Sequence, residues 1–253
     1  MEQFSRNELY WGEGFQKKLG VASAAIFGLG GVGGFALEAL ARGGVGEFTI
    51  VDFDKISTSN INRQVIALHS SVGESKAAAW VKRLKDINPD IKIRAVEDFC
   101  DASLYEEILT PAPDYVVDAI DTVRSKVELL KFCHGKIPVV TSFGAGNRMD
   151  CSKLRVTDLG EIKTSCRFAK NLISKLKHEG IERDLAVVIS DEPAKNLKKV
   201  ENIEKITKKS GEIVEFKKFT PASISTVPAV CGYLMANWIL LDMYRNFHGK
   251  IIP

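Results

Sequence analysis

The 253-residue sequence has few cysteines, and no two of them form a short pair. The five are Cys100, Cys133, Cys151, Cys166 and Cys231, an odd number with no CxxC spacing among them. Such a set argues against a disulfide framework and favours a reducing compartment, so we expect a cytoplasmic protein. The lack of CxxC pairs also argues against a structural zinc knuckle.

Long apolar runs are also lacking. The first residues, MEQFSRNELYWGEGF, contain no apolar core of the kind found in signal peptides. The most apolar late stretch, residues 227–243, includes Pro228, Asn237 and Asp242, which favours a buried helix over a membrane span. Hydrophobic residues make up 45% of the chain and charged residues 26%, which is typical of a folded domain. We therefore expect a single domain over residues 1–253.

The net charge of +3 is small but unevenly distributed. Residues 151–220 hold 16 Lys and Arg against 11 Asp and Glu, whereas residues 1–150 hold 17 against 20. A basic segment attached to an acidic one fits an anionic partner such as RNA, although a solvated lysine-rich face would explain the charge equally well. We interpret residues 151–220 as a basic lobe within the domain and expect a lysine-rich polar loop at 192–218.

Apolar runs alternate with helical periodicity through the first 145 residues, which indicates βαβ units and an α/β, Rossmann-like, mostly parallel sheet. The expected strands are 22–29, 47–53, 91–96, 115–120 and 138–142, and the expected helices are 33–42, 75–88, 101–109 and 125–134. An antiparallel strand at 153–156 should continue the sheet, followed by a basic helix at 166–178, an extended run at 185–190 and a closing helix at 225–246. Residues 1–20 are interpreted as a polar N-terminal arm anchored by Phe4, Tyr10, Trp11 and Phe15.

A glycine motif follows the first expected strand and opens the first helix. Residues 28–33, GLGGVG, match G-x-G-x-x-G, and Asp52 ends the next strand, where a ribose-binding carboxylate belongs. Tight helix–strand packing alone would also explain the glycines. This motif predicts a nucleotide site but does not distinguish NAD from ATP.

The polar segment after Asp52 favours ATP. Asn60, Arg63 and Lys76 follow in order, and cations of this kind balance the charge that develops on transferred phosphates, whereas hydride transfer needs no such cluster. Lys76 would lie in the first turn of a helix, where the macrodipole disfavours a cation unless an anion binds there. Either cation alone could be an ordinary surface residue. Asp118 and Asp121 end the fourth strand; Asp121 is the better Mg²⁺ ligand, because Asp118 could instead cap the next helix.

Five motifs, GLGGVGG, VDFDKISTSNINRQ, VGESKAAA, INPDI and DAIDT, together resemble the adenylating domain of the ubiquitin-activating-enzyme superfamily over residues 6–145. That superfamily includes the bacterial activators of the molybdopterin and thiamine pathways. The resemblance implies ATP with Mg²⁺, attack of a carboxylate on the α-phosphate, and an acyl-adenylate. It also implies roles: a nucleotide-binding turn at Gly28, Gly30, Gly31 and Gly33, ribose at Asp52, phosphates at Asn60, Arg63 and Lys76, and metal at Asp121. Arg63, Lys76 and Asp121 would be catalytic, and Arg6 would reach the ATP of a partner subunit.

Later segments, TSFGAGNRMD, LRVTDLGEI, FAKNLISKLKHEGI, VVISDEP and PASISTVPAVCG, are similar to one branch of that superfamily, the tRNA threonylcarbamoyladenosine dehydratases. This resemblance implies ATP-dependent cyclisation of N6-threonylcarbamoyladenosine in tRNA, a homodimer, and a bound monovalent cation, Na⁺ or K⁺. A cysteine desulfurase or sulfur-acceptor system is a further candidate partner.

Other functions remain open at the level of sequence. The principal alternative is adenylation of the C-terminal glycine of a ubiquitin-like sulfur carrier, although activators of that kind commonly carry two CxxC pairs. A non-catalytic nucleotide-binding adaptor comes next, and an NAD dehydrogenase last. Carrier activators also use a loop thiol, for which Cys166 beside Arg167 is the best candidate, whereas Cys231 in VPAVCGYL is expected to be packed. Cyclisation needs neither thiol, so no catalytic cysteine is assigned.

Overall fold

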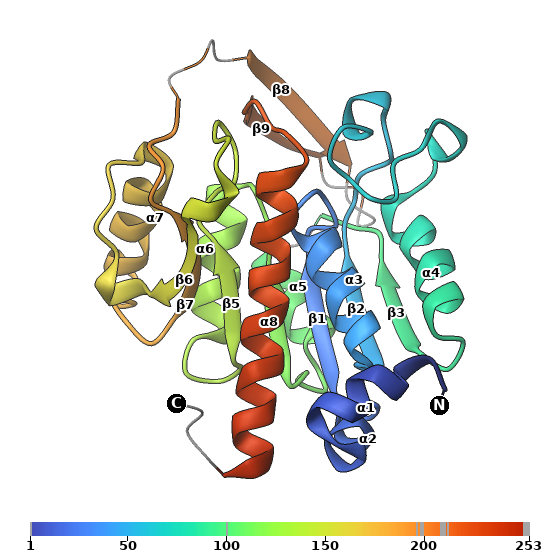
Figure 1. Ribbon diagram of the computed structural model, residues 1–253. Coiled ribbons are helices and arrows are strands. Elements are labelled where there is room, and N and C mark those ends of the chain that lie inside the picture. The colour runs from blue at the N-terminus through green and yellow to red at the C-terminus, as the bar shows by residue number, and fades with distance from the viewer. Residues whose placement is uncertain are drawn as a thin grey trace.

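The computed structural model describes residues 2–99, 101–195, 197, 200–207, 211 and 213–249. Its centre is a seven-stranded sheet with the order β3-β2-β1-β4-β5-β7-β6 (Figure 1). All neighbouring strands are parallel except β6, which runs antiparallel to β7. This confirms the predicted mostly parallel sheet with an antiparallel continuation. The strands are β1 Ser23–Phe27, β2 Glu47–Val51, β3 Lys92–Val96, β4 Tyr115–Asp118, β5 Val139–Ser142, β6 Leu154–Asp158 and β7 Ala186–Ser190.

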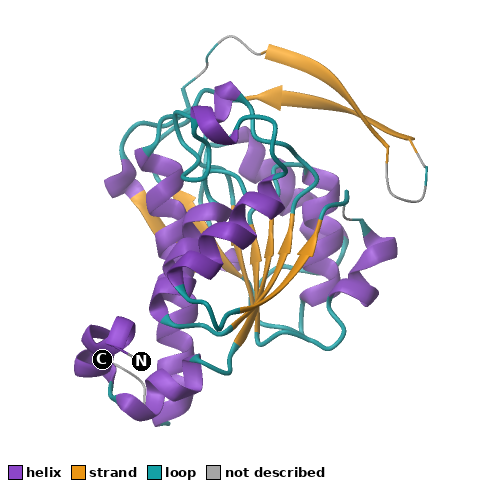
Figure 2. Cartoon of the chain, turned by 90° about the vertical axis from the view of Figure 1, so that its right-hand side faces the viewer, coloured by secondary structure: helices purple, strands orange, loops and turns teal. Residues whose placement is uncertain are grey.

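Helices cover both faces of the sheet (Figure 2). Alternate β1 residues point to opposite faces: Ala24 and Ile26 belong to one hydrophobic cluster, Ala25 and Phe27 to another. Because β1 is buried on both faces, its sequence is a continuous apolar run rather than an alternating one. The first cluster contains residues of α3 Gly33–Gly43, α4 Lys76–Ile87 and α8 Thr226–His248, and the second residues of α5 Ala102–Ile108, α6 Val123–Cys133 and α7 Arg167–His178.

The N-terminal arm is helical, with α1 Ser5–Trp11 and α2 Glu13–Leu19. Phe4 and Phe15 are buried as predicted, and Phe15 contacts Tyr244 and Phe247 of α8 with ring centroids 5.1 and 5.5 Å away. The prediction that Tyr10 is an anchor was wrong, because its side chain is 87% exposed. The arm is therefore held by some of its aromatic residues and not by all four.

The basic segment 151–220 contributes to the main sheet through β6 and β7 and covers it with α7. The prediction of a polar loop at 192–218 was wrong, because β8 Val200–Thr207 and β9 Ile213–Thr220 pair as an antiparallel hairpin with eight residue pairs. The apolar residues of VENIEKIT are spaced three apart, at Val200, Ile203 and Ile206, so the sequence does not show the period of two that indicates a strand. Lys198, Lys199, Lys208 and Lys209 of the expected loop lie outside the described residues.

The closing helix α8 is long and apolar enough that length and composition alone would allow it to cross a membrane. In the fold it lies along α3 and in front of the sheet (Figure 1), and Val227, Cys231, Met235, Ile239 and Met243 are buried in the core. Gly232 allows this close approach, since a Cβ there would lie 2.3 Å from the Val32 carbonyl oxygen. The apolar character of α8 is thus used in packing, as the sequence predicted.

Candidate nucleotide-binding site

The candidate site lies at the carboxyl edge of the sheet, between β1 and β4. The chain moves outward from β1 to β2 and β3 and then returns to place β4 on the other side of β1. The loops after β1 and β4 therefore diverge at this point, which is where open α/β sheets form a ligand crevice. The glycine turn follows β1, Asp52 follows β2, and Asp118 and Asp121 follow β4.

Two of the four predicted glycines are required by the turn itself. Gly28 has φ of +85°, and a Cβ there would lie 2.8 Å from the Ala119 carbonyl oxygen. A Cβ at Gly33 would lie 1.9 Å from the Gly28 carbonyl oxygen. These contacts join the turn after β1 to the loop after β4 and allow α3 to begin close to the strand.

The protein itself does not require glycine at position 30. A Cβ there would meet only the Gln64 side-chain nitrogen, at an ordinary 3.6 Å. Gln64 is buried, and its Oε1 lacks a hydrogen-bond partner among the described residues. Gly31 is tighter, because a Cβ at that position would lie 3.3 Å from both the Arg63 carbonyl oxygen and Pro228 Cβ. A ligand in contact with the glycine turn would explain both the absence of a side chain at Gly30 and the unpaired oxygen of Gln64.

Asp52 ties the second strand to the glycine turn. Its Oδ2 accepts a hydrogen bond from the Leu29 backbone N–H at 2.7 Å, and its Oδ1 accepts one from the Asp54 N–H at 2.8 Å. Burial raises the pKa of this carboxyl, while the Lys76 charge and the two N–H donors act to lower it. The carboxylate is thus fixed at the back of the crevice, beside the turn, in the place expected for a ribose ligand.

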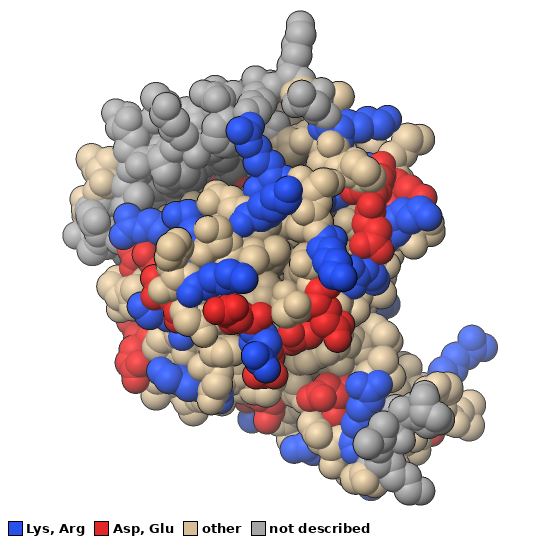
Figure 3. All heavy atoms as spheres, turned by 90° about the vertical axis from the view of Figure 1, so that its left-hand side faces the viewer, with Lys and Arg blue, Asp and Glu red and all other residues tan. Residues whose placement is uncertain are grey.

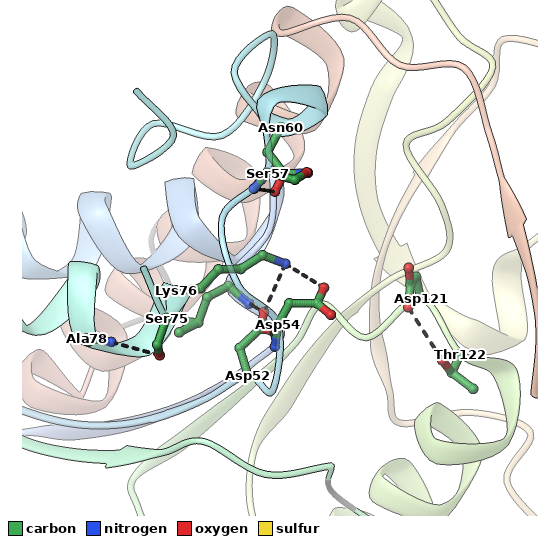
Figure 4. Close-up of polar contacts among 10 residues, drawn as sticks. Asp52, Asp54, Ser57, Asn60, Ser75, Lys76, Ala78, Asp121 and Thr122 are labelled. Atoms are coloured by element: carbon green, nitrogen blue, oxygen red, sulfur yellow. Dashed lines mark hydrogen bonds and ion pairs between the residues drawn. The ribbon is translucent and has the colours of Figure 1, made fainter. Parts of the chain in front are cut away.

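Lys76 begins α4 and is almost completely buried. Its Nζ lies 2.7 Å from Asp54 Oδ2 and 3.7 Å from Asp52 Oδ2 (Figure 4). Ser75 caps the helix by accepting a hydrogen bond from the Ala78 N–H at 3.3 Å. The two carboxylates therefore account for a cation in the first turn of this helix and hold its amine at the crevice.

Asn60 and Arg63 lie in the loop between β2 and α4. The Asn60 carbonyl Oδ1 accepts a hydrogen bond from the Ser57 N–H at 3.0 Å, which closes a short 3₁₀ turn. Arg63 Nη1 donates to the Ser59 carbonyl oxygen at 2.9 Å and to Asn62 Oδ1 at 2.8 Å. Burial lowers the pKa of the Arg63 guanidinium, and the negative charge of Asp121 acts in the opposite direction. Arg63 and Asp121 thus place opposite charges on the loops after β2 and β4.

The two aspartates after β4 have different environments. Asp121 is exposed and faces the Lys76–Asp54 pair from the other side of the crevice, and its Oδ1 accepts a long, 3.4 Å hydrogen bond from Thr122 (Figure 4). Exposed carboxylate oxygens at this position suit Mg²⁺, which commonly uses one or two carboxylates plus substrate phosphates. Groups of three or more potential metal ligands do not occur among the described residues.

Asp118 does not cap the following helix, so that interpretation was wrong. The N-cap of α6 is Thr122, and Asp118 is fully buried with its Oδ2 2.7 Å from Lys126 Nζ. Lys126 also donates to Thr141 Oγ1 at 2.9 Å, and Thr141 donates to Asp118 at 2.7 Å. This closed network joins β4, α6 and β5 directly beneath the loop that carries Asp121.

Arg6 lies far from the site of its own chain. It is exposed on α1, whose neighbour Asn7 donates hydrogen bonds to the Arg42 and Gly43 carbonyl oxygens at the end of α3. The glycine turn lies at the beginning of α3, about 16 Å away for eleven helical residues. Within one chain, Arg6 is therefore separated from the glycine turn by the length of α3.

The two cysteines considered from the sequence have different environments. Cys231 is buried as predicted, its Sγ lies 3.3 Å from Ser142 Oγ, and burial raises the pKa of its thiol to about 11. Cys166 is partly exposed at the start of α7.

Three residues that form the contacts of the site were not predicted from the sequence: Asp54, Gln64 and Lys126. Asp54 and Gln64 stand inside the motifs already noted, VDFDK and NINRQ, so their neighbours could have drawn attention to them. Nothing local marks Lys126, which reaches Asp118 only through the packing of α6 on the sheet.

Comparisons with known proteins agree with the mostly parallel α/β fold. The family model described as "ThiF family" matches residues 4–245. A Bacillus subtilis protein named tRNA threonylcarbamoyladenosine dehydratase is 36% identical over 99% of this chain and 98% of its own length. The crystal structure of Escherichia coli tRNA N6-threonylcarbamoyladenosine dehydratase in complex with ATP superposes with a TM-score of 0.84 at 29% identity, covering 99% of this chain and 97% of that chain.

A second kind of relative matches over a shorter length. A Haemophilus influenzae molybdopterin-synthase adenylyltransferase is 37% identical, but over only 53% of this chain and 55% of its own sequence. The likeness to this adenylyltransferase is therefore limited to about half the chain.

Proposed function

Because the chain belongs to the ThiF family, we propose that it is an ATP-dependent tRNA threonylcarbamoyladenosine dehydratase, an AMP-forming enzyme of the ligase type. The observation that carries this proposal is the extent of the match. The likeness to the Bacillus subtilis dehydratase spans 99% of the chain, whereas that to the molybdopterin-pathway adenylyltransferase spans 53%. The match to the dehydratase thus extends over nearly the whole of both chains, which favours a tRNA substrate over a carrier protein.

The reaction has two steps. A carboxylate oxygen of the threonyl group attacks the α-phosphorus of ATP, and the bond from that phosphorus to pyrophosphate breaks. The neighbouring carbamoyl nitrogen then attacks the acyl carbon, loses its proton, and displaces AMP as the acyl C–O bond breaks. The nucleoside has then lost one water equivalent and closed a hydantoin-type ring.

The charged residues around the crevice suit this chemistry. Arg63 and Lys76 stand where they can balance the negative charge that develops on the phosphates. Asp52 is fixed beside the glycine turn to accept a ribose hydroxyl, and Gly28, Gly30, Gly31 and Gly33 let backbone N–H groups approach the nucleotide. Asn60 uses its oxygen within its own turn, which leaves its amide N–H group for a phosphate oxygen. These roles follow from position and charge.

Mg²⁺ fits at Asp121, whose carboxylate is exposed and accepts just a long hydrogen bond from its neighbour Thr122 within the described part of the chain. When bound, the ion would supply positive charge to the phosphate oxygens and hold them in line with the attacking carboxylate. Lys126 and Asp118 keep the Asp121 loop in place from below.

In a homodimer, Arg6 would contact the ATP bound to the partner subunit, which it cannot do for the ATP of its own chain. Since Arg6 lies a helix length from its own site, it would serve the ATP of a partner subunit. Inactive Arg6→Ala and Arg63→Ala variants, mixed so that heterodimers form, should then recover AMP formation at one of the two sites. If mixing recovers nothing, Arg6 does not act across subunits.

The bound monovalent cation, the sulfur-acceptor partner and the cytoplasmic location stay predictions from the sequence.

The function is tested with ATP, Mg²⁺ and tRNA that carries N6-threonylcarbamoyladenosine, followed by mass spectrometry of the nucleosides. The expected result is that this nucleoside loses the mass of one water while one AMP is formed, and Arg63→Ala should give neither. Pyrophosphate exchange that depends on a carrier protein, without any change in the nucleoside, would instead support carrier adenylation. ATP binding without turnover by either route would indicate a nucleotide-binding adaptor.

A further inference from the structure

Helix α7, Arg167–His178, carries an exposed face that the catalytic proposal does not use. The helix contains Arg167, Lys170, Lys175 and Lys177 and no acidic residue. Its apolar residues Ala169, Leu172 and Leu176 are buried against the sheet. The outward polar face, called here the α7 basic face, consists of Arg167, Lys170, Asn171, Ser174, Lys175 and His178, all of them exposed.

The cations of this face are not neutralised by neighbours. Among the described residues, Arg167, Lys170 and Lys175 form no ion pair, whereas Lys177 lies 3.6 Å from Glu182 and nearby Lys131 pairs with Glu179 at 2.6 Å. Two of the three unpaired cations stand in the first turn of the helix, where the macrodipole disfavours positive charge. Their placement is unfavourable for the helix alone and favourable for binding an anion.

The α7 basic face begins at the same edge of the sheet as the crevice. Phe168 contacts Gly144 in the loop after β5: a Cβ at Gly144 would lie 3.1 Å from its ring. From there α7 runs for about 18 Å along the side of the molecule. Figure 3 shows this side: many Lys and Arg atoms are exposed over its upper and middle parts, with Asp and Glu atoms interspersed among them. A polyanion that enters the crevice can therefore continue along α7.

We propose that the α7 basic face binds backbone phosphates of the tRNA stem next to the nucleotide held in the crevice. This inference rests on the proposed function. Double-stranded RNA is recognised mainly through its shape and phosphates, which needs cations along a line and no base-reading groups. A membrane-binding helix would expose large apolar side chains beside its cations, and the outward face of α7 has none.

The test is a charge reversal with a matched control. The variant Arg167→Glu/Lys170→Glu/Lys175→Glu is compared with Lys18→Glu/Lys92→Glu/Arg245→Glu, which makes the same charge change at exposed positions elsewhere. We expect the α7 variant to bind tRNA at least about tenfold more weakly. Its slope of log K against log salt should be smaller by about 2–3, at roughly 0.7–0.9 for each phosphate that the variant no longer neutralises. The control should change neither quantity by as much.

Two further measurements separate this effect from misfolding and from loss of chemistry. The macrodipole favours the changes at Arg167 and Lys170 and disfavours the one at Lys175 in the last turn. Since these effects oppose each other and all three positions are exposed, the α7 variant should fold and bind ATP like the wild type. The milder Arg167→Gln/Lys170→Gln/Lys175→Gln variant should give an intermediate affinity. With a short single-stranded RNA that carries N6-threonylcarbamoyladenosine but lacks the stem as substrate, turnover should be equal in variant and wild type.

Equal tRNA affinity and salt slope in the variant and the wild type would overturn the assignment of α7 while leaving the dehydratase intact. So would an equal loss in the control, which would mean that only total charge matters. Wild-type protein that binds anionic phospholipid vesicles and fails to bind tRNA would overturn the inference together with the proposed function.

Discussion

Lys76 is a cation that two carboxylates hold in place in the folded protein. Its side chain is almost completely buried, and both Asp52 and Asp54 lie within 4 Å of its Nζ. The residue therefore has a structural interaction in addition to its proposed contact with phosphate. Arg63, by contrast, donates its hydrogen bonds to a carbonyl and an amide oxygen of its own loop.

This difference predicts different behaviour for two alanine variants that should both fail to form AMP. Lys76→Ala leaves two neighbouring carboxylates without their cation, so it should also lower the free energy of unfolding. We expect a loss of at most about 3 kcal/mol, because Asp54 is one-third exposed and solvent screens the pair. Arg63→Ala should change stability little. Urea unfolding without ATP measures the first effect and AMP release the second.

A double variant supplies the control. Adding Asp54→Asn to Lys76→Ala removes one of the two unpaired charges and should recover part of the lost stability. Normal AMP formation in both single variants would show that the assignment of the phosphate contacts is wrong.

The Cys231 thiol gives a prediction that depends on pH. Burial raises the pKa of Cys231 to about 11 from an ordinary value of 9.0, so the folded protein holds this proton more tightly than the unfolded chain. The resulting stabilisation is fully present below pH 9 and is lost as the pH rises through about 11. At about pH 8 Cys231 should react with iodoacetamide only after unfolding. Cys231→Ala should keep full AMP formation, and its loss would contradict the assignment of no catalytic cysteine.

At the scale of elements, one buried carboxylate joins α3 to α4. Glu38 on α3 accepts two hydrogen bonds from Arg83 on α4, at 2.6 and 2.8 Å, and one from Arg42 at 2.7 Å. Burial acts to raise the pKa of Glu38, but the bonds from Arg83 and Arg42 outweigh it, and the pKa is lowered below 4.5. These are the two helices that carry the glycine turn and Lys76.

The Glu38 cluster should therefore stabilise the protein at neutral pH and lose that effect in acid. A lowered folded-state pKa gives stability above pH 4.5 that disappears as the pH falls through the folded value. Glu38→Gln should lower the unfolding free energy by about 3 kcal/mol near neutral pH, and by less in mild acid. Melting temperatures across this range measure the effect. The exposed pair Arg94–Glu107 is the control: Glu107→Gln should cost less than about 1 kcal/mol. An equal, pH-independent loss in both would contradict the role of Glu38.

The success of prediction varied between elements for physical reasons. Strands β1, β4 and β5 are buried on both sides, so mostly apolar runs such as SAAIF and YVVD predicted them well. The β8–β9 hairpin was missed because its polar positions are Lys and Glu, which looked like a solvated loop. Tyr10 was misassigned because aromatic character alone does not tell which side of a short helix faces the protein.

The same limits apply to the site. Glycines and charged residues that directly follow strands could be placed from sequence, since the ends of parallel strands meet at one edge. The contacts Lys76–Asp54 and Lys126–Asp118 could not, because each depends on side chains that packing brings together. Nor does any local pattern show that Asp118 lies beneath the crevice and Asp121 within it.

At the scale of the whole molecule, the loop after β5 binds the base of the β8–β9 hairpin, that is, the segments just before and after it. The Asn147 carbonyl oxygen accepts a hydrogen bond from the Lys195 N–H at 2.9 Å, before the hairpin, and Asn147 exchanges two bonds with Ala222 after it, at 2.7 and 2.8 Å. Asn62, next to Arg63, donates to the Ser223 carbonyl oxygen at 2.9 Å. Both ends of the hairpin segment are thus fixed to the loop after β5, and its second end is also fixed to the loop that carries Arg63.

Asn147 also has φ of +59°, which asparagine tolerates better than alanine. Asn147→Ala should lower the unfolding free energy by about 1–3 kcal/mol and should speed hydrogen exchange at the Ala222 amide. Hydrogen-exchange mass spectrometry measures the second effect. Asp184 has the same φ of 59° but lies in an exposed loop, so Asp184→Ala should share the strain and leave exchange at Ala222 unchanged. Unchanged exchange in both variants would mean that Asn147 does not hold the base of the hairpin.

The packing of α8 against the glycine turn has a consequence for synthesis on the ribosome. Pro228 lies against Gly31, so the turn that follows the first strand is covered by the last described helix. At about 5–20 residues per second, roughly ten to forty seconds separate the translation of these two segments. During that interval the nascent chain has the glycine turn with neither Pro228 packed against Gly31 nor Ser223 bonded to Asn62. The order of translation thus delays assembly of the nucleotide site until α8 has been made.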